Sequence, residues 1–208
     1  MFNGQAHQDE FVLHCLKHKR DGTFLEIGSN HYRDINNTYL LEYSYNWRGI
    51  MVEYNNAFLP DYTNFRSRSS HVIEDATTIN FRAKFESCGF PSVIDYLQID
   101  LEVENRSTLT TLENLDTQVM DDYKFRVVTF EHDIYSGDHF NTRQSSRDIF
   151  QRRGYVRVFS DVANSIEYPY EDWYVHPELV DMDYINRVKR DASMDWRDIM
   201  KILTQEYV

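Results

Sequence analysis

Short apolar runs bounded by turn residues alternate with amphipathic stretches along most of this 208-residue chain. An apolar run of four or five residues between turn residues is typical of a strand buried on both faces, whereas apolar positions at helical spacing indicate a helix. The runs predict strands at Thr23–Ile27, Gly49–Glu53, His71–Glu74, Ile94–Ile99, Arg126–Phe130 and Tyr155–Phe159. The amphipathic stretches predict helices at Gln8–His18, Asn37–Tyr45, Phe81–Cys88, Ser107–Leu115, Thr142–Arg153 and Trp196–Gln205.

Strands that alternate with helices at this spacing predict an α/β fold with a doubly wound, mostly parallel sheet. The segment Ser160–Pro177 predicts a return strand and an aromatic loop, so we expect seven strands with helices on both faces. The dipeptide Pro60–Asp61 is expected to break the segment after the second strand. Because no repeat or linker interrupts the pattern, residues 1–208 are expected to form one domain. That domain would have an N-terminal helix in residues 1–21 and a helical extension in residues 178–208.

Composition narrows the classes of function. The net charge of −12 disfavours a nucleic-acid partner, because phosphates would be repelled. No apolar run approaches the roughly 18 residues needed to span a membrane, and charged residues within Met1–Arg20 argue against a signal peptide. Cys15 and Cys88 favour reduced core thiols, which fits a cytoplasmic protein. The 15 tyrosines and three tryptophans suit a packed core and also suit sugar faces or adenine, and both interpretations stay open.

A glycine and an acidic residue mark the ends of the first two predicted strands. Gly28 follows the first strand, where the missing Cβ lets backbone approach a ligand closely. Glu53 ends the second strand 25 positions later (53 − 28), close to the roughly 20 expected where a carboxylate accepts hydrogen bonds from both ribose hydroxyls. Since ligands of such sheets bind at the carboxyl ends of the strands, this pair predicts a nucleoside-containing cofactor.

The loop after the first strand distinguishes between nucleoside cofactors. A dinucleotide needs a diphosphate cradle, usually Gly-x-Gly-x-x-Gly, but the loop Gly28–Arg33 has one glycine and bulky residues in place of the others. S-adenosylmethionine has a ribose and an adenine but no phosphate, so one glycine suffices. Acidic residues also suit its ammonium and sulfonium groups. The sequence therefore favours S-adenosylmethionine over a nicotinamide cofactor.

Six segments, in this order, resemble the FkbM-type methyltransferases. The segments are Gly22–Gly28, Asn37–Glu42, Asn46–Glu53, Ile94–Glu102, Val128–Asp133 and Glu171–Pro177. The resemblance runs from about Gly22 to Pro177 and implies a Rossmann-like class I methyltransferase fold that uses S-adenosylmethionine. Members of this group commonly methylate hydroxyl oxygens, often on sugars, so the resemblance implies a carbohydrate O-methyltransferase.

The resemblance also implies which residues contact the cofactor. Carried over by position, these are Glu26, Gly28, Ser29, Asn37 and Thr38 around the methionine part, Glu53 at the ribose, Tyr54 and Asp75 at the adenine, and Asp100 near the reacting centre. Asp75 also suits the N-cap of a helix. The chain departs from the family pattern at Tyr32 and Val103, where many relatives have glycine.

Four acidic residues and a histidine follow the fourth and fifth strands, at Asp100, Glu102, Glu131, His132 and Asp133. A sugar hydroxyl is a weak acid, so a base or a metal must assist the loss of its proton. In one hypothesis Asp100, Glu131 and His132 bind Mg²⁺ or Mn²⁺, and Glu102 or Asp133 removes the proton. In the other, no metal binds and His132 is the general base.

The acceptor is expected to lie above this cluster, with Tyr135, Trp173, Tyr174 and His176 as candidate lining residues, although aromatic residues also pack cores and anchor loops. A deoxyhexose such as rhamnose in a glycan is the favoured acceptor. The competing interpretation is a catalytically inactive cofactor- or glycan-binding module of a larger glycan-building system. The departures at Tyr32 and Val103 motivate that interpretation.

Overall fold

A computed structural model describes residues 2–207, which contain one eight-stranded sheet. Its strands are β1 (Thr23–Ile27), β2 (Arg48–Glu53), β3 (Ser70–Ile73), β4 (Val93–Ile99), β5 (Lys124–Glu131), β6 (Val156–Ala163), β7 (Pro169–Val175) and β8 (Met194–Asp195). Their order is β3-β2-β1-β4-β5-β7-β6-β8, and β7 alone runs antiparallel to its neighbours. The order reverses between β1 and β4, which is the point where a doubly wound sheet binds its ligands.

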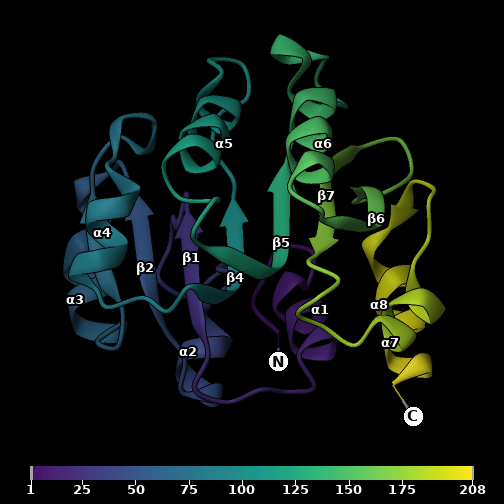
Figure 1. Ribbon diagram of the computed structural model, residues 1–208, viewed down its shortest axis with the longest axis horizontal. Helices are drawn as coiled ribbons and strands as arrows, with labels where there is room; N and C mark the ends of the chain where they lie inside the picture. Colours follow the sequence, from purple (N-terminus) through teal and green to yellow (C-terminus); the bar gives the residue numbers. More distant parts are fainter. Residues whose placement is uncertain (1, 208) are drawn as a thin grey trace.

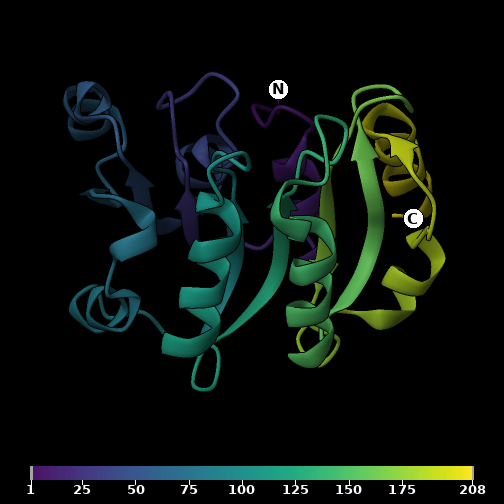
Figure 2. The ribbon, with the colours of Figure 1, turned by 90° about the horizontal axis from the view of Figure 1, so that it is seen from above.

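Helices cover both faces of the sheet (Figures 1 and 2). One face carries α4 (Phe81–Ser87), α5 (Ser107–Gln118) and α6 (Thr142–Arg152), and the other carries α1 (Gln8–Cys15), α2 (Tyr39–Tyr45) and α3 (Leu59–Phe65). The C-terminal part adds α7 (Met182–Val188) and α8 (Trp196–Glu206), and α8 contacts α1. Three short 3₁₀ helices are η1 (Asn56–Phe58), η2 (Ala76–Thr78) and η3 (His139–Asn141). Within residues 2–207 no helix has the length and apolar character needed to cross a bilayer.

The core is divided by the sheet into two apolar clusters, because successive side chains of a strand point to opposite faces. Leu25 and Ile27 of β1 belong to the cluster under α4, α5 and α6. Phe24 belongs to the cluster under α1 and α2, with Trp47. All five residues of β1 are buried, as expected for a central parallel strand covered on both faces.

The predicted doubly wound α/β sheet is confirmed, with one strand more than the seven expected, because Met194–Asp195 pairs with the end of β6. The prediction that Pro60–Asp61 breaks its segment was wrong. Pro60 lies in the first turn of α3, where the missing proline N–H has no helical partner to lose. The expected aromatic loop is instead strand β7, and every residue of β7 after Pro169 is buried.

Candidate functional site

Two adjoining hollows lie at the carboxyl ends of the parallel strands, around the point where the strand order reverses. The larger, of ≈ 680 Å³, extends from Gly28 after β1 to Asp100 after β4 and Glu131 at the end of β5. The smaller, of ≈ 240 Å³, lies between the ends of β2 and β3 and the start of α5. Both are lined by Glu53, Tyr54, Leu101 and Glu102. The structure thus brings most of the residues predicted from strand ends to one edge.

Gly28 permits two strand ends to meet. Its backbone has a φ of +82°, and a Cβ at this position would lie 1.8 Å from the carbonyl oxygen of Asp100. The Asp100 N–H in turn donates to the carbonyl of Ile27 at 3.0 Å. The missing side chain therefore makes room for the backbone that carries Asp100, in addition to any ligand.

Glu26 lines the larger hollow, and its buried carboxylate is fixed by hydrogen bonds from neighbouring side chains. Its Oε2 accepts hydrogen bonds from Thr38 Oγ1 at 2.9 Å and Asn36 Nδ2 at 3.0 Å. The fully buried Arg66 donates to the same two side chains, and its positive charge offsets the rise that burial causes in the pKa of Glu26. Asn37 lines the hollow as predicted, whereas Thr38 lies behind Glu26.

The carboxylate of Glu53 is fixed by two backbone donors. Its Oε2 accepts from Asn30 N and its Oε1 from Asn55 N, each at 2.8 Å. The Tyr62 hydroxyl donates to the carbonyl of Asn30 and so anchors the loop that supplies the first donor. Each carboxylate oxygen can still accept a further hydrogen bond. The predicted ribose acceptor therefore has a defined position, and Tyr54 beside it is exposed.

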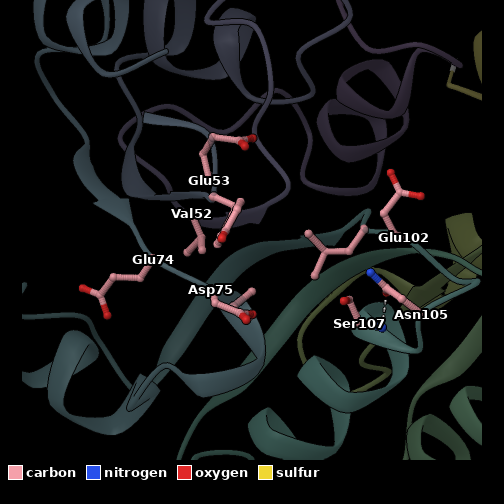
Figure 3. A pocket seen from close by; sticks show the side chains of 10 residues that line it. Val52, Glu53, Glu74, Asp75, Glu102, Asn105 and Ser107 are labelled. Atoms are coloured by element: carbon pink, nitrogen blue, oxygen red, sulfur yellow. Dashed lines mark hydrogen bonds between the residues drawn. The ribbon is translucent and has the colours of Figure 1, made fainter. Parts of the chain in front are cut away.

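Figure 3 shows Asp75 at the smaller hollow, with its carboxylate directed toward the side where Ser107 lies. Asp75 Oδ1 accepts a hydrogen bond from Thr77 N at 2.9 Å and thereby caps η2, which is the N-cap role considered for it. Val52 and Leu101 supply apolar surface to the same hollow. Apolar walls with a few carboxylates at the rim suit a flat, polar-edged ring.

Three carboxyl groups meet at the inner end of the larger hollow. Burial, and then the charge of Asp100, raise the pKa of Glu131 well above its ordinary value, and side-chain hydrogen bonds with Asp100 and Asp133 add to the rise. Burial also raises the pKa of Asp100 and of Asp133. Neighbouring carboxyls cannot all ionise easily, so a proton is held more tightly in this cluster than on an isolated carboxyl. The cluster can therefore exchange a proton with a bound ligand.

His132 is not a member of this cluster, which corrects both of its predicted roles. Its side chain is buried on the opposite face of the strand end from Glu131, because successive side chains alternate. Its Nε2 lies 3.5 Å from Asp161 Oδ1 and 3.6 Å from Asp172 Oδ1, and its Nδ1 accepts from Ile134 N. The structure therefore supports neither a metal set of Asp100, Glu131 and His132 nor His132 as general base.

His132, Asp161 and Asp172 themselves have ligand atoms within 4.8 Å of one another, a spacing found once among residues 2–207. Arg147 already donates to both carboxylates, through Nε to Asp172 Oδ2 at 2.7 Å and through Nη2 to Asp161 Oδ1 at 2.9 Å. Arg143 adds a second contact to Asp161. Two guanidinium groups thus balance two carboxylates, and we interpret this group as an ion-pair network that leaves no charge for a cation to neutralise.

Three of the four predicted acceptor residues lie elsewhere, because β7 runs antiparallel and carries its C-terminal end to the opposite edge of the sheet. Trp173 is fully buried and stacks on Phe11 with ring centroids 4.7 Å apart. Tyr174 is buried and donates to Asp172 Oδ2. The backbone N–H of His176 donates to Arg126 at the start of β5. Tyr135 alone stays at the carboxyl edge, beside Asp133.

The sequence did not identify the side chains that fix the predicted site residues through hydrogen bonds. Asn36 and Arg66 fix Glu26, while Tyr62 fixes the loop next to Glu53. Arg66 comes from the end of α3, a helix that the sequence did not predict. Asn36 stands directly before the predicted Asn37–Thr38 pair, so its position in the loop was the one available signal.

Next to the carboxyl cluster, Glu171 of β7 stands directly opposite Glu131 of β5 in the antiparallel strand pair. Its side chain is buried, and Gln8 Nε2 donates to its Oε1 at 2.9 Å. Burial is the main reason that its pKa rises to about 8. Glu171 therefore keeps its proton in the folded protein at neutral pH, whereas it would ionise in the unfolded chain.

Replacing Glu171 with glutamine is expected to remove a pH-dependent loss of stability. The raised pKa means that the stabilising effect of the protonated form is complete below the ordinary value near 4.5 and is lost as the pH rises through about 8. At pH 8 the variant should be more stable by about 2–4 kcal/mol, since one pKa unit corresponds to about 1.4 kcal/mol. Urea denaturation from pH 5 to 9 measures this, with Glu167→Gln at the exposed hairpin tip as control. A wild-type profile that is parallel to that of Glu171→Gln would contradict the expectation.

Comparison with known proteins bears on the fold. No family model matches the chain, and no curated protein matches its sequence. A Clostridium thermocellum protein provisionally named an rRNA-methylase superposes with a TM-score of 0.56 at 11% identity, covering 84% of this chain and 98% of that one. A mutant of Spodoptera frugiperda DNMT2 gives 0.55 at 11% identity, over 84% and 55% of the two chains. A TehB-like S-adenosylmethionine-dependent methyltransferase from Corynebacterium glutamicum gives 0.50 at 10% identity, over 81% and 87%.

The chain has the class I methyltransferase fold. This confirms the fold class that the sequence predicted. At 10–11% identity the similarity establishes the fold, whereas the reaction of a class I methyltransferase fold has to be argued from the residues of its site.

Proposed function

We propose that the protein is an S-adenosylmethionine-dependent O-methyltransferase that acts on a carbohydrate hydroxyl. The observation that carries the proposal is the fixed carboxylate of Glu53, which lines both hollows at the point where the strand order reverses. A carboxylate in this position suits the two hydroxyls of a ribose. The O-methylation and the sugar acceptor rest on the resemblance to the FkbM-type methyltransferases.

The residues of the larger hollow fit S-adenosylmethionine in charge and in hydrogen bonding. Six acidic side chains line the hollow, at Glu26, Glu53, Asp100, Glu102, Glu131 and Asp133, and they complement an ammonium and a sulfonium. The amide side chains of Gln5 and Asn37 line it as well, and the buried Asn37 Oδ1 has no hydrogen-bond partner in the described residues. An unpaired buried acceptor is costly unless a ligand or water satisfies it.

Methyl transfer to a hydroxyl breaks a carbon–sulfur bond, forms a carbon–oxygen bond and releases the hydroxyl proton. S-adenosylmethionine would supply the electrophilic methyl group and leave as S-adenosylhomocysteine. Asp133 is half-buried beside Glu131 and is suited to accept the proton from the acceptor hydroxyl, which Glu131 then shares through their hydrogen bond. The elevated pKa of these carboxyls makes them better bases than exposed acids.

A divalent cation at the same carboxyls remains part of the proposal. Asp100, Glu131 and Asp133 carry oxygens of the kind that Mg²⁺ or Mn²⁺ prefers, but their ligand atoms do not lie within the 4.8 Å spacing of a ready site, so a cation would have to draw them together. A bound cation would lower the pKa of an acceptor hydroxyl and would relieve the repulsion among the three acids. Full activity after exhaustive dialysis against EDTA would remove the cation from the proposal.

Replacing Glu53 with glutamine is expected to weaken S-adenosylmethionine binding about 10- to 100-fold, because the ribose hydroxyls lose a charged acceptor. Glutamine keeps an acceptor oxygen for one of the two backbone donors, Asn30 N or Asn55 N, and both hydrogen bonds are exposed, so the fold should persist. Isothermal titration calorimetry measures the affinity. Glu74→Gln is the matched control: Glu74 directly follows the neighbouring strand β3 and lines the smaller hollow, but its carboxylate pairs with Lys84 and points away from Glu53 (Figure 3). Equal affinities for the two variants would contradict the assignment of Glu53.

Turnover is tested by mass spectrometry of a sugar panel incubated with S-adenosylmethionine and Mg²⁺ or Mn²⁺. A mass gain of one methylene equivalent on a deoxyhexose is the expected result. Asp133→Asn should lower kcat more than it lowers cofactor affinity, because it removes a proton acceptor and leaves the ribose contact intact. Tight cofactor binding without transfer to any sugar would instead favour the cofactor-binding module.

A further inference from the structure

Two exposed tyrosines face each other at the carboxyl edge, next to the carboxyl cluster. Tyr135 follows β5 and Tyr168 lies at the tip of the β6–β7 hairpin, with ring centroids 5.9 Å apart and ring planes at 71°. The exposed fractions are 50% and 53%, so the rings are not part of the core. The backbone holds the pair, since Tyr135 N donates to Pro169 O and Asp133 N to Tyr170 O.

This aromatic pair adjoins the proton-accepting end of the hollow. Tyr135 lies two residues after Asp133, whose side chain lines the larger hollow. The N–H groups of Asp133 and Tyr135 donate to the carbonyls of Tyr170 and Pro169, the residues that follow Tyr168, so both tyrosines border the group proposed to accept the proton of the acceptor. A ring that stacks on this pair would present its edge to Asp133.

The acidic lining of the larger hollow limits which charged substituents a sugar ring bound there can carry. The residues lining the larger hollow include six carboxyls and no lysine, arginine or histidine. A phosphate brought there would be repelled, since like charges a few ångströms apart cost free energy even with solvent screening. A neutral sugar ring meets no such cost, because its hydroxyls donate to carboxylates and its apolar C–H face packs on aromatic rings.

We propose that Tyr135 and Tyr168 form the acceptor platform and select an unphosphorylated sugar ring. This inference rests on the proposed methyltransferase function and names the class of acceptor at that same site. In the protein without a bound cation it excludes sugar phosphates and nucleotide-linked sugars, whereas a divalent cation at the carboxyls would attract a phosphate. Tyr168, in the hairpin that precedes β7, thus takes the role that the sequence suggested for Trp173 and His176.

Saturation-transfer NMR tests the platform without needing turnover. The probes are the methyl glycosides of rhamnose, fucose, glucose and mannose, with rhamnose 1-phosphate as the charged partner. Spectra are recorded with and without S-adenosylhomocysteine. We expect transfer to the ring C–H protons of at least one methyl glycoside. Titration of the signal with ligand should give an about tenfold weaker affinity for rhamnose 1-phosphate, which corresponds to about 1.4 kcal/mol. Tyr168→Ala should abolish the signal, and Tyr168→Phe should retain it because the ring remains.

Ile166→Ala is the matched control, because Ile166 is an exposed apolar side chain at the same hairpin tip. No transfer to any glycoside, stronger transfer to rhamnose 1-phosphate, or equal loss in Ile166→Ala and Tyr168→Ala would each overturn the platform. Calorimetry with S-adenosylmethionine on the wild-type protein reports separately on the proposed function. Cofactor binding without a glycoside signal would contradict the acceptor platform alone. Absence of cofactor binding would contradict the proposed methyltransferase function.

Discussion

Replacing Gly28 with alanine is expected to abolish S-adenosylmethionine binding and to destabilise the fold by several kcal/mol. The new Cβ would lie 1.8 Å from the carbonyl oxygen of Asp100, and this neighbour is backbone, which cannot rotate away as a side chain can. The φ of +82° adds about 1–2 kcal/mol for any residue with a Cβ. To relieve the collision, the ends of β1 and β4 must separate, and the hollow between them then changes shape. Calorimetric titration and urea denaturation measure the two effects.

Gly154→Ala provides a matched control for this prediction. Gly154 has the same φ of +82°, but a Cβ there would meet no atom within 4 Å. Its replacement should cost about 1–2 kcal/mol from the backbone conformation alone and should leave cofactor affinity unchanged. The difference between the two variants isolates the steric effect at the site. Similar losses of stability in both would show that close packing against Asp100 is not what Gly28 provides.

Much of the fold could be predicted from the sequence because its strongest signals are local. Short runs such as Thr23–Ile27, apolar apart from Thr23 and Glu26 and bounded by turn residues, favour a buried parallel strand, and the observed β1 has the predicted bounds. Local signals fail where pairing with a segment far away in the sequence decides whether a stretch forms a strand and in which direction that strand runs. The prediction of an aromatic loop missed β7, whose pairing with β5 and β6 buries Tyr170, Trp173 and Tyr174 on the two faces of the sheet. Pro60 failed for a similar reason, since a proline interrupts or begins a helix depending on its position.

The candidate site likewise contains residues that local sequence signals could locate and residues whose position depends on tertiary structure. Gly28, Glu53 and Asp100 could be located from the sequence because each stands at a strand end, and parallel strand ends share one edge of the sheet. The sequence placed Glu131 and His132 in one metal site, although neighbouring residues on a strand point to opposite faces. Applying the two-residue alternation to the end of β5 would have separated them.

The residues that support the site could not be predicted, because their partners are far away in the sequence. Arg66 lies 40 positions after Glu26 (66 − 26), and its role depends on how α3 packs beside the loop before α2. Tyr168 depends likewise on the hairpin that returns it to Tyr135. Strand ends can thus be placed by periodicity, whereas the side chains that hold or complete a site depend on tertiary packing.

Replacing Asp172 with alanine is expected to cost about 3–5 kcal/mol, a large share of the 5–15 kcal/mol typical of a domain. Asp172 is fully buried, and it accepts hydrogen bonds from Arg147 and Tyr174 and from the backbone N–H of Asp161 at 2.8 Å. Its loss removes one of the two carboxylate partners of the largely buried Arg147 guanidinium and leaves the part-buried N–H of Asp161 without its acceptor. Urea denaturation at pH 7 measures the change in free energy of unfolding.

The expected pH dependence follows from the same contacts. His132 and Arg147 hold the pKa of Asp172 below its ordinary value despite burial, so its stabilising effect is present at neutral pH and is lost only in acid, as the pH falls through the folded value. Asp191→Ala is the control, since its pair with Arg157 is exposed to solvent and should contribute no more than about 1 kcal/mol. Equal effects of the two replacements would contradict the ion-pair interpretation, and His132, Asp161 and Asp172 would then have to be tested as a cation site.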